Sequence, residues 1–325
     1  MRSRTVLVPF VLVVLGVLAA AAATGWLQNS ASFSDADPFA AAGRGMLSPD
    51  WRHTYANPWL QAGPFELLIC LAGHTLGINA VGEPIALNMI GAAALLVVAG
   101  FVLRRWQLLL VVGAGAIGLG VVSDMYEIGH PAELFIALIW LLAARAARRD
   151  RVLLAGVLLG VSAGFETWGL LGAPLLLLLP RFRSSVLAGA IALAVAAAIY
   201  APFALGGDFH MFEQHWKITG GVESLLFGEA RHFTWPMRLG EALVVVGAGS
   251  ALALRLRRYA LSVWVVPAAT SVFRLVLDPV RYGYYWDTAL ILLLVGTAPW
   301  ILAPRDLATS WASLLRPRSV PAPVD

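Results

Sequence analysis

Long apolar runs separated by short polar stretches dominate the hydropathy pattern of this 325-residue chain. The apolar runs are continuous rather than alternating and are rich in Leu, Ala and Val, which favours helices over the strands of a transmembrane barrel. A helix needs about 20 apolar residues to cross a hydrocarbon core. We predict ten crossing helices, at residues 5–27, 80–103, 107–122, 131–144, 152–165, 167–180, 185–205, 239–254, 260–277 and 287–303.

The first apolar run has some features of a secretory signal peptide, because two arginines precede it and an Ala-rich stretch ends it. Its apolar part, residues 6–23, is longer than the usual signal-peptide core of about 7–15 residues. We therefore expect an uncleaved first helix.

Composition places the chain among integral membrane proteins. It is 59% hydrophobic and only 13% charged, whereas a soluble domain carries roughly 25% charged residues. The net charge of +4 comes almost entirely from arginines at the ends of apolar runs, so it indicates membrane orientation rather than nucleic-acid binding. Cys70 is the only cysteine, which excludes an internal disulfide and a Cys-based metal site.

The arginine clusters predict the topology, because cytoplasmic loops collect Lys and Arg. Placing every cluster inside gives ten crossings with both termini cytoplasmic, provided that residues 60–78 do not cross. We expect that stretch to lie in the outer interface, where Pro64, Glu66 and His74 fit better than in a clean crossing. The domain then spans residues 1–303, and residues 304–325 form a Pro-rich cytoplasmic tail.

Polar residues other than arginine gather in loops that this topology places on one face, the outer one. These loops are residues 28–79, 123–130, 165–168, 206–238 and 278–286. The inner loops carry little beyond arginine. The function is therefore expected on the outer face of a plasma membrane.

Asp35 and Asp37 lie just after the first helix. Two carboxylates at this spacing suit a general base or a cation site. The alternative is a helix cap, since Pro38 is a favoured residue at the first position of a helix.

A second acidic group follows the third predicted helix and consists of Asp124, Glu127, His130 and Glu133. We expect Pro131 to open the next helix, which places Glu133 in the first turn, where a carboxylate suits the helix dipole. Ionisable groups that enter a bilayer are functional candidates, and capping with interfacial solvation is the alternative.

Further candidates lie in the remaining outer loops. Glu166 and Trp168 stand at the apex of a tight hairpin whose two arms are short for a crossing, so the apex could be recessed into a cavity. An arginine beside tyrosines can bind a lipid phosphate, whereas aromatic residues alone usually anchor a helix at the interface. The phosphate-binding or anchoring candidates are Lys217, Arg231, His232, Arg281, Tyr282 and Tyr284.

Taken in order, these motifs resemble the GT-C superfamily of lipid-linked-sugar glycosyltransferases, which includes oligosaccharyltransferases, protein O-mannosyltransferases and actinobacterial mannosyl- and arabinosyltransferases. The matching features are the Asp35-Ala36-Asp37 motif, the Pro/Gly-rich stretches at 55–58 and 61–64, the second acidic motif, the hairpin sequence at 155–160 and the Tyr-rich segment at 282–286. Many relatives carry a lysine at the hairpin apex, where this chain has Glu166, Thr167 and Trp168.

The resemblance implies an all-α polytopic GT-C-like fold and transfer of a sugar from a polyprenyl-phosphate donor to an envelope glycan, lipid or protein. It favours Asp37 as general base, with Asp35 in reserve, and assigns Asp124 and Glu133 to the acceptor or to a divalent cation such as Mg²⁺ or Mn²⁺. The alternatives are a lipid or solute transporter or flippase, and a non-catalytic membrane subunit of an envelope assembly.

Overall fold

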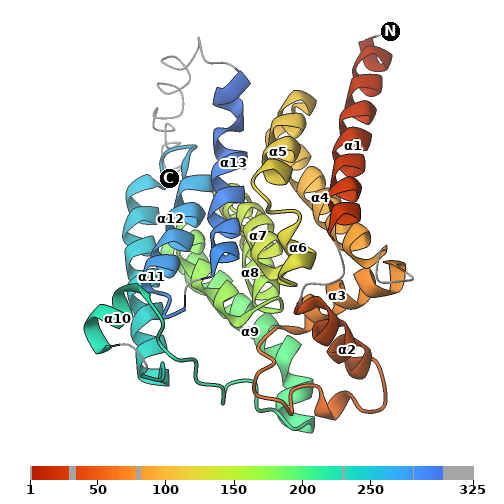
Figure 1. The fold of residues 1–325 in the computed structure, drawn as a ribbon. Helices are drawn as coiled ribbons and strands as arrows, with labels where there is room; N and C mark the ends of the chain where they lie inside the picture. Colours follow the sequence, from red (N-terminus) through yellow and green to blue (C-terminus); the bar gives the residue numbers. More distant parts are fainter. Residues whose placement is uncertain (1, 29–33, 78–81, 229–230, 281, 303–325) are drawn as a thin grey trace.

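The computed structural model describes residues 2–28, 34–77, 82–228, 231–280 and 282–302. Within these ranges the chain is helical, apart from turns and an isolated β-bridge between Lys217 and His232 (Figure 1). The predicted helical class is confirmed. The predicted apolar runs correspond to α1 (Arg2–Leu27), α4 (Gly82–Leu103), α5 (Trp106–Gly118), α7 (Ala132–Arg148), α8 (Val152–Ala163), η2 (Thr167–Leu178), α9 (Phe182–Gly206), α11 (Trp235–Leu256), α12 (Ser262–Leu277) and α13 (Asp287–Leu302).

Four helices of the described chain are long and apolar enough to cross a membrane: residues Val8–Leu27 of α1, and all of α4, α9 and α11. Large apolar side chains such as Leu12, Leu193 and Leu243 are exposed on them. A soluble monomer rarely exposes many such residues together, so these features are those of a helical membrane protein.

Helix α7 lies at the centre of the bundle and packs against α4, α8, η2, α12 and α13. Trp140, Leu134 and Leu138 on this helix are buried, and its many alanines let neighbouring helices approach closely. Its N-terminal end carries the second acidic motif and its C-terminal end carries arginines. The central helix therefore connects two chemically different ends of the molecule.

The hairpin partner of α8 is a twelve-residue 3₁₀ helix, η2. Runs of this length are uncommon, and the rise of about 2.0 Å per residue gives η2 a length of about 24 Å, longer than an α-helix of the same residue count. The backbone carbonyl of Gly169 in η2 accepts hydrogen bonds from Trp140 Nε1 and Ser162 Oγ. These side-chain donors satisfy a helix carbonyl and hold η2 against α7 and α8.

The shorter elements gather at the end of the bundle opposite the N-terminus, where Figure 1 shows α2, α3 and α10. They are α2 (Ala36–Met46), η1 (Trp51–His53), α3 (Pro64–Gly77), α6 (Asp124–Glu127), α10 (Gly221–Phe227) and η3 (Gly283–Trp286). At the other end, Arg145 donates to the carbonyl of Val102 and Arg148 to that of Arg257. The polar loops and the arginine-rich turns thus lie at opposite ends, and the compartment that each end faces stays a prediction.

Candidate functional site

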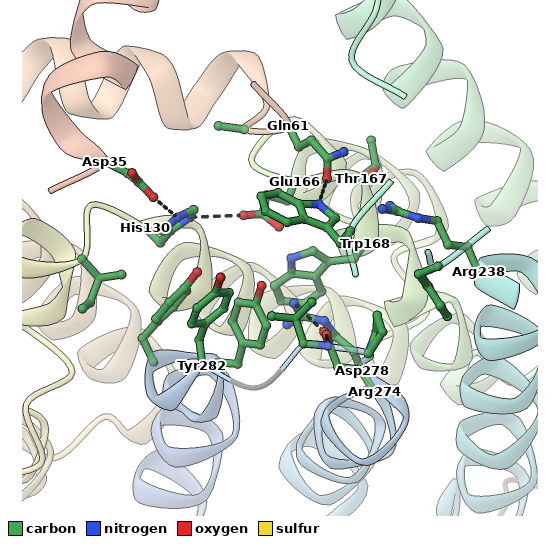
Figure 2. A pocket seen from close by; sticks show the side chains of 18 of the residues that line it. Asp35, Gln61, His130, Glu166, Thr167, Trp168, Arg238, Arg274, Asp278 and Tyr282 are labelled. Atoms are coloured by element: carbon green, nitrogen blue, oxygen red, sulfur yellow. Dashed lines mark hydrogen bonds and ion pairs between the residues drawn. The ribbon is translucent and has the colours of Figure 1, made fainter. Parts of the chain in front are cut away.

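A cavity of about 940 Å³ opens at the loop-rich end of the bundle (Figure 2). Its walls come mainly from the five polar loops predicted from the sequence, which are far apart along the chain. Leu171, Glu241, Ala242 and Arg274 from the adjoining helices complete them. Charged and polar side chains meet aromatic rings on its surface. The lining includes Asp35, Trp59, Gln61, Asp124, Glu127, His130, Glu166, Trp168, Trp216, Trp235, Arg238, Glu241, Arg274, Asp278, Tyr282, Tyr284 and Tyr285.

His130 lies among three carboxylates from different elements. Its Nε2 is 3.0 Å from Asp35 Oδ2, and its Nδ1 is 3.6 Å from both Glu66 Oε1 and Glu166 Oε1. The imidazole stacks on the Tyr284 ring with centroids 4.9 Å apart. One side chain therefore joins the first loop, helix α3 and the α8–η2 turn.

Backbone contacts place Asp35 beside His130. The Asp35 amide donates to the carbonyl of Ile128, and the hydroxyl of Ser34 donates to that of Tyr126. Gly129 adopts a φ of +86°, and a Cβ at this position would collide with the backbone of Asp35 and Ala36. Glycine is needed both for this conformation and for the close approach.

Asp35 occupies the N-cap position of α2, yet its side chain makes no cap hydrogen bond. Its Oδ2 instead contacts His130, and Oδ1 accepts no hydrogen bond from the described residues. A carboxylate at the edge of a cavity with one free oxygen can accept a proton from a bound hydroxyl group. This geometry favours a functional role over capping.

The cluster around His130 has unusual electrostatics. Burial lowers the pKa of His130, but the acidic side chains of Asp35, Glu166 and Glu66 beside it outweigh this effect and hold the pKa well above its usual value. Burial raises the pKa of Glu66, in the first turn of α3, to about 8, although its contact with His130 acts in the opposite direction. The acidic neighbours therefore favour the protonated form of the imidazole.

The same atoms could hold a divalent cation. Ligand atoms of Glu66, His130 and Glu166 all lie within 4.8 Å of one another. Glu66 Oε2 and His130 Nδ1 are buried and have no hydrogen-bond partner among the described residues, whereas buried polar atoms are usually satisfied. The contact between Asp35 and the other ring nitrogen matches the carboxylate–histidine arrangement that orients metal-bound imidazoles.

Arg274 in the cavity wall forms a buried ion pair with Glu133, which lies behind the wall. Arg274 Nη1 in α12 donates to Glu133 Oε1 in α7 at 3.0 Å, and the hydroxyl of Thr288 in α13 donates to the same carboxylate. The guanidinium lies 3.8 Å from the ring centroid of Trp168 and 4.9 Å from that of Tyr285. The Glu133 carboxylate thus joins α7, α12 and α13, and Arg274 contacts two aromatic side chains.

Arg238, in the first turn of α11, lines the cavity without an ion-pair partner among the described residues. Its guanidinium lies over the rings of Phe233 and Trp235, at 5.7 and 5.6 Å from their centroids. Glu241 is close enough to influence it electrostatically. The donors of Arg238 remain available to an anion.

Tyrosines and tryptophans form much of the remaining wall. The rings of Tyr282 and Tyr284 stack at 5.5 Å, and Tyr285 meets Tyr284 edge to face at 4.7 Å. On another wall, Trp216 Nε1 donates to the side chain of Gln61. Flat rings beside hydrogen-bonding groups suit a ligand that has apolar faces and polar edges.

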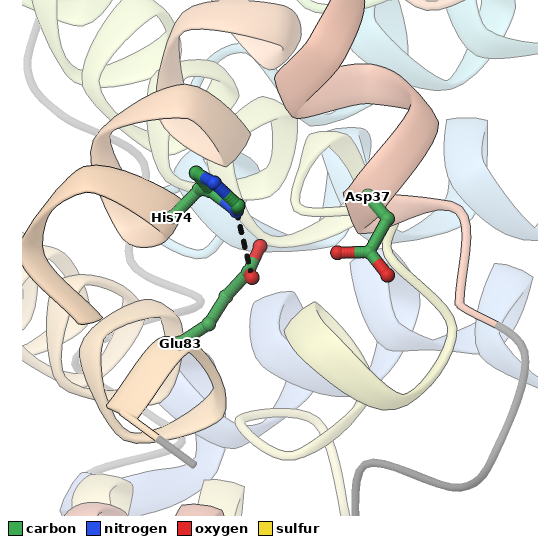
Figure 3. Close-up of side chains that lie close together, drawn as sticks. All are labelled: Asp37, His74 and Glu83. Carbon is green, nitrogen blue, oxygen red and sulfur yellow. Dashed lines mark hydrogen bonds and ion pairs between the residues drawn. The ribbon is translucent and has the colours of Figure 1, made fainter. Parts of the chain in front are cut away.

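The structure separates the two aspartates of the first motif. Asp35 lines the cavity, whereas Asp37 lies outside it, beside His74 and Glu83 (Figure 3). His74 Nδ1 is 3.0 Å from Glu83 Oε2, and the three side chains form a second group that could hold a cation. The cavity therefore favours Asp35, not Asp37, as the functional carboxylate.

The other predicted site residues divide in the same way. Asp124 and Glu127 line the cavity. Burial raises the pKa of Asp124 and the charge of Glu127 raises it further, whereas a hydrogen bond with Asp287 acts in the opposite direction. Glu133 lies behind the wall in its ion pair. Arg231 and His232 are exposed and do not line the cavity. Arg281 lies outside the described residues.

Sequence reasoning missed Glu66, Arg238 and Arg274 as site residues. The signal for Arg274 was present, because it is the one charged residue within the predicted span 260–277 and intramembrane charges often mark functional sites. Glu66 was assigned only to the interface, and Arg238 resembled other loop arginines. Their importance depends on tertiary neighbours.

Comparisons with protein-family models, curated proteins and solved structures give no match to this chain.

Proposed function

We propose that the chain is a GT-C-like membrane glycosyltransferase that moves a sugar from a polyprenyl-phosphate donor to an acceptor hydroxyl group. One observation carries the proposal: a partly free carboxylate, Asp35, and an unpaired guanidinium, Arg238, line the same aromatic cavity at one end of an apolar bundle. Glycosyl transfer to a hydroxyl group from a phosphate-linked sugar needs a base and a cation that stabilises the leaving group.

Asp35 acts as the general base. Its carboxylate accepts the proton of the acceptor hydroxyl while the acceptor oxygen forms a bond to the anomeric carbon. The bond from that carbon to the phosphate oxygen breaks, and its electron pair leaves on polyprenyl phosphate. His130 is a positioning residue, because its contact with Oδ2 fixes Asp35 and leaves Oδ1 without a hydrogen-bond partner among the described residues.

Arg238 binds the phosphate of the donor and then of the leaving group. Guanidinium groups bind phosphate through paired hydrogen bonds, and Arg238 has no competing carboxylate within ion-pair distance among the described residues. Many GT-C proteins have a lysine at the hairpin apex, where this chain has Glu166. Arg238 would supply the positive charge that this chain lacks at the apex. Arg274 is less suitable, because Glu133 already pairs with it.

A divalent cation such as Mg²⁺ or Mn²⁺ fits Glu66, His130 and Glu166, and when bound it would supply positive charge beside Asp35. Independently of a cation, the aromatic rings bind the faces of the sugar and exclude water. The tyrosine wall at 282–285 and the tryptophans Trp59 and Trp216 are placed for this role.

The proposal includes the predicted topology, with ten crossings, cytoplasmic arginine turns and the cavity on the outer face. The donor would enter the cavity from the bilayer. Charge placement supports a transferase over a transporter. In the described helices, the Asp, Glu, Lys and Arg residues lie within about two turns of a helix end, whereas transporters place ionisable groups near mid-membrane.

Incubating the purified chain in liposomes with radiolabelled polyprenyl-phosphate sugars and an envelope extract tests the proposal. We expect release of polyprenyl phosphate and a labelled acceptor, both lost in Asp35→Asn. Movement of intact donor between leaflets without cleavage would instead identify a flippase. Neither cleavage nor movement with any donor would leave a structural subunit as the better explanation.

A further inference from the structure

A second hollow, of about 330 Å³, lies at the arginine-rich end of the bundle, between α4, α7 and α8. Most of its surface is apolar, and arginines border it. Its lining includes the apolar residues Val97, Phe101 and Leu154 and the arginines Arg145, Arg149 and Arg151. We call this hollow the arginine groove. The arginine groove lies at the C-terminal end of α7, whereas the cavity lies at its N-terminal end. The two share no lining residue.

The arginines of the groove carry positive charge without paired negative charge. Among the described residues, Arg145, Arg149 and Arg151 make no ion pair with a carboxylate. Arg145 is also repelled by Arg149 and Arg104. Like charges beside an apolar wall are unfavourable until an anion joins them.

Arg145 differs from an arginine that only marks orientation. Arginines at the end of a membrane helix usually extend their charge into water. Arg145 instead lies over the ring of Phe101, 5.1 Å from its centroid, and Nη1 donates to the carbonyl of Val102. Its Nε is buried and has no partner among the described residues. The guanidinium therefore forms part of the groove.

The groove also has an exposed apolar floor. Val97 is 72% exposed, Phe101 52% and Leu154 42%, and α4, which carries two of these residues, is one of the four helices able to cross a membrane. An acyl chain covers such a surface favourably, since each buried methylene contributes about 0.8 kcal/mol. A ligand that joins an acyl chain to a phosphate matches both the apolar floor and the arginines of the groove.

We propose that the arginine groove binds an anionic phospholipid, with the headgroup phosphate on Arg145, Arg149 and Arg151 and an acyl chain along Val97, Phe101 and Leu154. Basic pockets between membrane helices bind anionic headgroups through this combination of charge and apolar contact. The proposal goes beyond the transferase function and does not depend on it.

The test uses the full-length chain, delipidated in detergent and titrated with phosphatidylglycerol, phosphatidylcholine or inorganic phosphate, with binding measured by native mass spectrometry and thermal shift. We expect phosphatidylglycerol to bind and to raise the unfolding temperature, and the other two to have little effect. The double variant Arg149→Gln/Arg151→Gln should weaken phosphatidylglycerol binding at least tenfold. Leu154→Trp, which keeps the charges but fills the groove, should weaken it similarly.

Arg255→Gln/Arg258→Gln is the matched control, because it removes two exposed arginines from the same end of the bundle but outside the groove. Its phosphatidylglycerol affinity should stay within twofold of the parent. Equal weakening by both double variants would mean that only surface charge attracts the lipid, and this would overturn the proposal. Equal stabilisation by inorganic phosphate, or unchanged binding in Leu154→Trp, would also overturn it.

Discussion

His130 makes contacts that no other side chain of the cavity could replace. Its two ring nitrogens face Asp35 on one side and Glu66 and Glu166 on the other. A neutral amide could donate hydrogen bonds here but carries no positive charge to neutralise the carboxylates. The charge state of this residue therefore links the stability of the site to pH.

Stability of the EDTA-treated protein in detergent should fall as the pH rises. The raised pKa of His130 means that its stabilising charge is fully present below its unfolded value of about 6.5 and is lost as the pH passes through the higher folded value. Glu66 acts in the same direction, because its raised pKa makes its ionisation towards pH 8 unfavourable in the folded state. Thermal unfolding measured from about pH 6 upward tests this.

His130→Gln should be less stable than the parent at the low end of this range and should show a flatter dependence on pH. His53→Gln is the control, because His53 pairs with Asp208 at an exposed position and does not line the cavity. An unchanged pH profile in His130→Gln would show that His130 is not charged in the folded protein.

At the scale of elements, the segment before α3 and the turn after α8 meet through their backbones. The amides of Gly63 and Phe65 donate to the carbonyls of Phe165 and Gly164. These bonds bring Glu66 and Glu166 to the same ring nitrogen of His130, Nδ1. A Cβ on Gly63 would collide with the same two carbonyl oxygens.

Gly63→Ala should therefore separate the two segments and destabilise the protein by about 1–3 kcal/mol, the usual cost of overpacking. Gly45→Ala is the matched control, since a Cβ there meets nothing within 4 Å; in α2 it should be neutral or slightly stabilising. Thermal unfolding of both variants measures the difference. Equal unfolding temperatures would show that the close approach at Gly63 is absent.

The ion pair between Glu133 in α7 and Arg274 in α12 should stabilise the packing of these two helices. Arg274→Met leaves the Glu133 carboxylate buried without its cation and should cost about 3–5 kcal/mol. Arg274→Met/Glu133→Leu removes both charges and should recover much of that loss. Chemical denaturation in detergent measures both variants. A double variant less stable than the single one would mean that the pair does not act as a unit.

The helices themselves could be predicted because apolar runs carry their own signal. Their bounds agree with the structure to within a few residues, except at 119–122, which forms a turn where Gly120 has a φ of +84°. The 3₁₀ form of η2 could not be predicted, because its apolar sequence does not distinguish it from an α-helix. Asp35 and Asp37 are similar in sequence, and the contacts of the Ser34–Asp35 segment with residues 126–130, which place Asp35 at the cavity, are tertiary.

For the whole molecule, the separation of acidic cavity and arginine turns predicts which residues face each side of the membrane. In a Cys70→Ala background, Arg52→Cys at the cavity end should react with an impermeant maleimide added outside cells. Arg181→Cys, between η2 and α9, should react only after permeabilisation. Both native arginines are exposed, so access is not limited by packing. The reverse pattern would invert the topology and place the cavity inside.

The proposed sugar transfer depends on a base in the cavity that removes a proton from the acceptor hydroxyl group. The most direct measurement compares the rate of sugar transfer in Asp35→Asn and Asp37→Asn, with folding verified by thermal unfolding. General-base catalysis contributes about 10²–10⁴-fold, so Asp35→Asn should lose at least a hundredfold while Asp37→Asn keeps most of its activity. Full activity in Asp35→Asn, or a selective loss in Asp37→Asn, would contradict the account.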